Sequence, residues 1–134
     1  MTIQQEELII SIISEAVSRS ISLAETLTET RKADNAQSVI TLNEIHSLFL
    51  AAKTGYYLRN DMPSMIYIDL FNIFEKLYSE LRHALAYDHG KLNHTEEFDE
   101  LLSDLTHYYE ALNAEFINRK TESKQKGLSI HDKG

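Results

Sequence analysis

The feature that most constrains this chain is the recurrence of apolar residues at every third or fourth position through four long segments, with almost nothing to interrupt them. The whole sequence contains 1 proline and 4 glycines in 134 residues. Because proline and glycine are the residues that most often stop or weaken helices, this scarcity favours long helices. No alternating strand pattern competes with the helical one. The sequence therefore predicts an all-α fold.

The predicted helices are long and the connections between them are short. Connections of about four to seven residues make an antiparallel four-helix bundle with up-down-up-down topology the expected architecture. A capping box between Thr2 and Gln5 begins the first helix, Pro63 lies in the first turn of the third, and Gly90 ends the third. The helices are expected over about residues 3–31, 36–59, 63–89 and 93–119.

A polar segment that lacks helical periodicity follows the fourth helix. The chain is therefore divided into a four-helix bundle domain over residues 1–120 and a flexible, basic, disordered tail over residues 121–134.

One apolar stripe on each helix is expected to form the core. The predicted core residues are Ile9, Ile13, Ala16, Val17, Ser20, Ala24 and Leu27 on the first helix, Leu42, Ile45, Phe49, Ala52 and Tyr56 on the second, Ile66, Leu70, Ile73, Phe74, Leu77, Leu81, Ala84 and Leu85 on the third, and Phe98, Leu101, Leu102, Leu105, Tyr108, Tyr109, Leu112 and Phe116 on the fourth.

Composition excludes several classes of protein. The chain has 0 cysteines, so disulfides, thiolate metal sites and cysteine nucleophiles are excluded. No apolar run reaches the roughly 20 residues of a membrane span. The N-terminal segment carries glutamates and lacks the positive start of a signal peptide. A soluble, cytoplasmic protein that does not enter a membrane is expected.

The charge of the chain is negative and unevenly distributed. The formal net charge is -8, and no lysine or arginine occurs between Lys91 and Arg119. Such an acidic helix repels nucleic acid, whose binding depends on lysine and arginine, and it attracts a basic protein. We expect an acidic protein-binding module of the inhibitor, immunity-protein or antitoxin type, or an accessory regulator. The expected contact residues are Glu96, Glu97, Glu100, Asp104 and Glu110.

A second reading comes from residues 78–93, YSELRHALAYDHGKLN, in which six residues separate Arg82 from His89. This pattern resembles the motif of the HEPN-domain superfamily, where an arginine is followed after a short spacer by a histidine at a helix end. Many members of that superfamily are helical ribonucleases that act as toxins or antiphage effectors. The resemblance implies a metal-independent endoribonuclease, or an inactive relative, built across a homodimer. In it Arg82 would orient the scissile phosphate of an RNA substrate and His89 would act as general acid or base.

Simpler interpretations of the same residues stay open. Arg82 could pair with Asp88 or Glu75, and His89 could merely favour the C-terminus of its helix.

Three pairs of acid and histidine resemble the ligands of carboxylate-bridged metal sites in helical bundles. In the two pairs on the third and fourth helices, the histidine points away from the core stripe. We therefore expect no metal and no cofactor. The three pairs are Glu80 with His83, Asp104 with His107, and Glu44 with His46.

Overall fold

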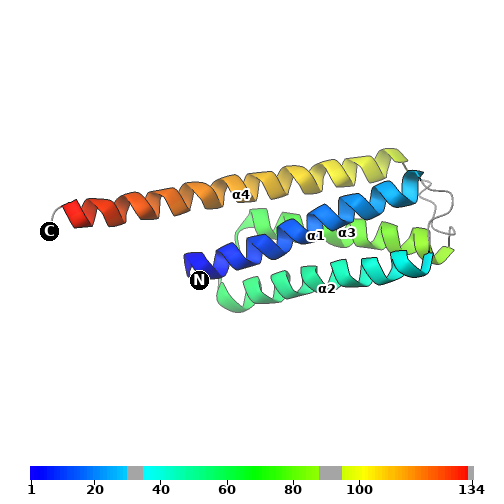
Figure 1. Cartoon of the computed structure of the whole chain (residues 1–134), viewed down its shortest axis with the longest axis horizontal. Coiled ribbons are helices and arrows are strands. Elements are labelled where there is room, and N and C mark those ends of the chain that lie inside the picture. Colours follow the sequence, from blue (N-terminus) through cyan, green and yellow to red (C-terminus); the bar gives the residue numbers. More distant parts are fainter. Residues whose placement is uncertain (30–34, 88–94, 133–134) are drawn as a thin grey trace.

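A computed structural model describes residues 1–29, 35–87 and 95–132 of the protein. In this part the chain forms a bundle of four helices and contains no strands. The connections between the helices lie largely outside that part. Figure 1 shows the helices running alternately up and down. They are α1 (Ile3–Glu29), α2 (Asn35–Arg59), α3 (Met65–Tyr87) and α4 (Thr95–Asp132). The all-α, antiparallel four-helix prediction is confirmed.

Each helix packs against two others. α1 contacts α2 and α4, and α3 likewise contacts α2 and α4. α2 and α4 therefore lie diagonally across the bundle, and their outer faces point in opposite directions. This arrangement decides which surfaces are available for binding.

The N-terminus of α1 is closed by the predicted capping box. The backbone N–H of Gln5 donates to the Thr2 hydroxyl at 3.1 Å, and the backbone N–H of Thr2 donates to Gln5 Oε1 at 3.0 Å. These two bonds satisfy donors that have no partner within the helix, so the local sequence sets where α1 begins.

The start of α3 differs from the prediction. Pro63 lies before the helix, which begins at Met65. The carbonyl of Ser64 accepts the first helical bond from the N–H of Ile68 at 3.2 Å, and the N–H of Ser64 donates to the Tyr56 hydroxyl at 3.0 Å. The tertiary bond to Tyr56 fixes Ser64 at the helix boundary, and proline spacing alone could not reveal it.

The end of α4 also differs from the prediction. The helix continues past Arg119, where the sequence predicts its end, to Asp132. Figure 1 shows this part of α4 projecting beyond the other three helices. The segment contains glutamate, lysine and glutamine, which have high intrinsic helix propensity. The flexibility expected for residues 121–134 stays a prediction.

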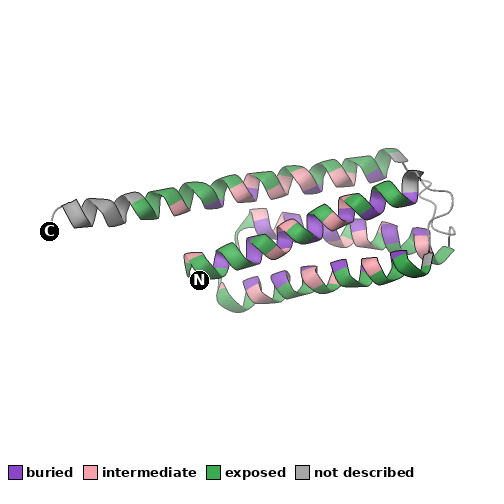
Figure 2. Ribbon diagram, viewed as in Figure 1, coloured by how far each residue is buried: buried purple, intermediate pink, exposed green. Residues whose placement is uncertain are grey.

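The core lies along the inward stripes of all four helices, as Figure 2 shows by the buried residues on their facing sides. Every predicted core residue of α1 and α2 is buried, whereas α3 buries most of its predicted residues and α4 buries half. The residues predicted for the core but only partly buried are Ile66, Ile73, Leu85, Leu101, Leu102, Tyr108 and Tyr109. The prediction missed Tyr67 and Phe71, which are also buried.

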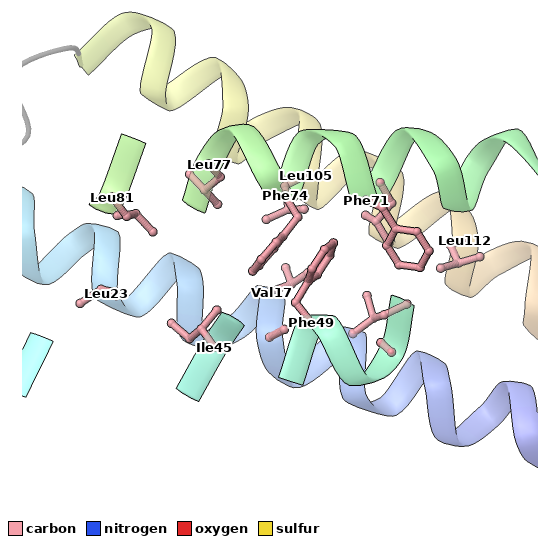
Figure 3. Packing of buried hydrophobic residues seen from close by; sticks show 14 of the residues in the cluster. Val17, Leu23, Ile45, Phe49, Phe71, Phe74, Leu77, Leu81, Leu105 and Leu112 are labelled. Carbon is pink, nitrogen blue, oxygen red and sulfur yellow. The ribbon is translucent and has the colours of Figure 1, made fainter. Parts of the chain in front are cut away.

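An aromatic cluster joins α2 to α3 at the centre of the core. The Phe49 ring stacks on Phe74, with ring centroids 3.6 Å apart, and meets the edge of Phe71 at 5.3 Å. Figure 3 shows these three rings in contact. Burial of one such ring contributes about 1.5–3 kcal/mol. This cluster therefore contributes to holding α2 against α3.

No helix in the described part of the chain is both long enough and apolar enough to cross a membrane.

Candidate binding surfaces

The first candidate surface is the outward side of α4. We call Glu96, Glu97, Glu100, Asp104 and Glu110 the acidic face. All five residues are exposed. At about 100° per residue, the five acids spread over an arc of about 140° that faces away from the buried Phe98, Leu105 and Leu112.

The charges of the acidic face have no balancing cation among the described residues. No described lysine, arginine or histidine lies within 4.0 Å of any of its carboxylates. Glu100 lies one turn from both Glu96 and Asp104, and like charges at this spacing destabilise a helix by about 0.2–0.5 kcal/mol per pair. A cationic partner would remove this repulsion.

The first two basic residues that follow the acidic face on α4 form ion pairs within the bundle. Arg119 contacts both carboxylate oxygens of Glu6, at 2.5 and 3.3 Å, and the Lys120 ammonium lies 3.0 Å from Glu7. Glu6 is buried, with 9% of its side chain exposed. These ion pairs join α4 to the first turns of α1.

A buried phenol lies near the same end of the bundle. The Tyr67 hydroxyl is buried and has no hydrogen-bond partner among the described residues. Burial, together with the charge of the Glu6 carboxylate, raises the pKa of Tyr67 well above its ordinary value. Tyr67 packs on Tyr56, with ring centroids 3.7 Å apart, so its role is to fill the core.

The structure describes only half of the Arg82–His89 motif. Arg82 is exposed on α3 and makes no ion pair with a described residue. Glu75, one expected partner of Arg82, instead lies 3.8 Å from the Lys53 ammonium. Asp88, His89 and Gly90 lie outside the described residues, so whether Arg82 and His89 meet stays a prediction.

The histidines with metal-like spacing have other neighbours. His46 stacks on Tyr78 at 4.0 Å, and His83 lies against Tyr87 at 4.9 Å. The Glu44 carboxylate accepts a hydrogen bond from Arg19 at 3.1 Å. In the described residues, no three acids or histidines come close enough together to hold a metal ion.

Two open grooves flank α1. The groove between α1 and α4 has a volume of about 720 Å³, with Phe116 and Ile117 in one wall and the serines of α1 in the other. The groove between α1 and α2 has a volume of about 710 Å³ and contains Ile12, Ile40, Leu48 and Ala51.

The sequence prediction missed the α1–α2 groove. Its signal was present, because α2 carries Ile40 and Leu58 outside the core stripe and is apolar on more than one side.

Comparison with protein-family models, with curated proteins and with solved structures gave no match.

Proposed function

We propose that this protein is a non-enzymatic binding module, and that the acidic face of α4 docks on a basic surface of another protein. The observation that supports this proposal is a row of five exposed carboxylates without a described counterion on one side of a helix. Inhibitors, immunity proteins, antitoxins and accessory regulators are the kinds of protein that use such a face. A cytoplasmic location, expected from the sequence, is part of the proposal.

The proposal depends on the difference between carboxylates that are paired with a cation of this chain and carboxylates that have no cation among the described residues. Glu6 and Glu44 are paired with arginines of this chain and gain little from a new cation. The acidic face carries charge that no described cation compensates, and a cluster of like charges creates a potential that speeds and orients the approach of an opposite charge. The same potential opposes the approach of RNA or DNA.

Charge reversal tests the proposal with a defined probe, a lysine- and arginine-rich helical peptide. The variant Glu97→Lys/Glu100→Lys should bind the peptide about tenfold more weakly, because each exposed ion pair contributes up to about 1 kcal/mol. The matched control is Glu25→Lys/Asp61→Lys, which alters net charge by the same amount at exposed sites outside α4. Equal loss in the two variants would mean that net charge, rather than the acidic face, attracts the peptide.

A second candidate function is the HEPN-like ribonuclease. One observation favours it: Arg82 is exposed and unpaired among the described residues, as an arginine that contacts a phosphate must be. Incubation of the pure protein with RNA tests this candidate, beside Arg82→Ala and His89→Ala. Cleavage that both variants lose, with unchanged helical content, would establish the enzyme and overturn the binding module. Absence of cleavage by the pure wild-type protein would exclude the enzyme.

A further inference from the structure

We infer that a second copy of this chain docks on the face formed by α1 and α2, giving a symmetric dimer. We call this surface the α1–α2 face, and its apolar members are Leu8, Ile12, Ile40, Leu48, Ala51 and Leu58. The inference is independent of the proposed function, since α4 takes no part in this face.

The apolar members form two parallel stripes. On α1, Leu8 and Ile12 lie one turn apart, and the charged residues Glu15 and Arg19 follow them on the same side of the helix. Three members are strongly exposed: Leu8 at 63%, Ile40 at 51% and Leu58 at 79%. They lie at both ends of the antiparallel pair, so the exposed apolar surface follows the length of the two helices.

The charge of the α1–α2 face identifies the occupant. The charged residues of its groove are Glu15, Arg19 and Glu44, and Arg19 bridges the two carboxylates at 3.2 and 3.1 Å. Two molecules that each carry a net charge of -8 repel one another over most of their surfaces. They meet at the lowest electrostatic cost through this nearly neutral face, which both copies possess.

The size of the face is sufficient for a stable dimer. α2 has 25 residues and is therefore about 37 Å long, and two helices side by side are about 20 Å wide. The face covers roughly 740 Å² on each copy, or about 1,500 Å² in total, which lies within the range of about 1,600 ± 400 Å² for specific complexes.

This dimer has two consequences for the rest of the molecule. The acidic faces of both copies point away from the interface, because α4 lies diagonally across the bundle from α2. Arg82 lies on α3, which contributes nothing to the α1–α2 face, so this dimer is different from one that joins two Arg82–His89 sites.

The test compares two isoleucines with equal exposure. Ile40 and Ile117 are both 51% exposed, but Ile40 lies on the α1–α2 face and Ile117 in the groove between α1 and α4. Sedimentation of the full chain at about 100 µM should show a dimer for wild type and for Ile117→Glu. Ile40→Glu and Leu58→Glu should sediment as monomers with unchanged helical content, because each would bury an unpaired carboxylate.

Every other pattern overturns the inference. A monomeric wild-type protein at this concentration would contradict the dimer and indicate that a different protein binds the α1–α2 face. Dissociation by Ile117→Glu, or dimers that persist in Ile40→Glu, would place the contact elsewhere. Salt separates this result from the proposed function: screening should strengthen a dimer of two acidic chains, whereas it should weaken binding of a cationic peptide to α4.

Discussion

Arg119 of α4 and Glu6 of α1 form a two-bond ion pair across the bundle, with the shorter distance 2.5 Å, although 113 residues separate them in the sequence. Glu6 is buried, so its carboxylate depends on this guanidinium for compensation of its charge. The pair joins α4 to α1 at one end of the bundle.

Removal of this guanidinium should destabilise the fold more than removal of its neighbour. Arg119→Ala leaves Glu6 buried without a cation and should lower the free energy of unfolding by about 1–3 kcal/mol, less than for a fully buried pair because Arg119 is half exposed. Lys120→Ala breaks an exposed pair with Glu7 and should cost less than about 1 kcal/mol. Urea unfolding of both variants measures the difference, and equal costs would show that burial of Glu6 is unimportant.

The Tyr67 hydroxyl should contribute nothing favourable to stability. Tyr67→Phe removes a buried polar group that has no described partner and keeps the ring, so thermal unfolding at neutral pH should show unchanged or higher stability. A loss of more than about 1 kcal/mol would reveal a hydrogen bond to this hydroxyl.

Tyr67 should also make the fold sensitive to alkali. The folded chain keeps the phenol protonated at a pH where the unfolded chain has lost that proton, because the pKa is raised on folding. Stability is therefore complete below about pH 10, the ordinary pKa, and falls above it by up to about 1.4 kcal/mol per pH unit from this group. Denaturant titrations from neutral pH to above pH 10 should show a shallower decline for Tyr67→Phe, and identical slopes would contradict the assignment.

The aromatic cluster should dominate the packing between α2 and α3. Phe49→Ala removes a ring that contacts Phe71 and Phe74 and should cost about 3–5 kcal/mol. The adjacent Leu50 is exposed, so Leu50→Ala should change stability by less than about 0.5 kcal/mol. If Phe49→Ala does not fold, Phe49→Leu provides a milder loss that urea unfolding can measure. Similar values for positions 49 and 50 would contradict the packing.

The sequence predicts most of the bundle because its information is local. The capping box of Thr2 and the apolar stripes depend on residues within a few positions of one another. The capping box and the stripes of α1 and α2 are confirmed, whereas α3 and α4 bury only part of their predicted stripes. The start of α3 depends on a bond from Ser64 to Tyr56 of another helix, which no local pattern contains.

The candidate surfaces also differ in whether a local sequence pattern or the packing between helices determines them. Exposure of the acidic face follows from helical spacing, and sequence analysis located it. The α1–α2 face requires knowledge of which helices are neighbours, since Ile40 and Leu8 lie on different helices. Periodicity could not show that Arg119 pairs with Glu6, or that the Tyr67 hydroxyl has no hydrogen-bond partner among the described residues.

Calorimetric titration of a lysine- and arginine-rich helical peptide into the protein at increasing salt tests the role of the α4 carboxylates most directly. Wild type should bind with an affinity that falls steeply as salt rises, and Glu97→Lys/Glu100→Lys should bind weakly with little salt dependence, whereas Glu25→Lys/Asp61→Lys should resemble wild type. Peptide binding that is the same in all three proteins, or tight binding of RNA by wild type, would contradict the account.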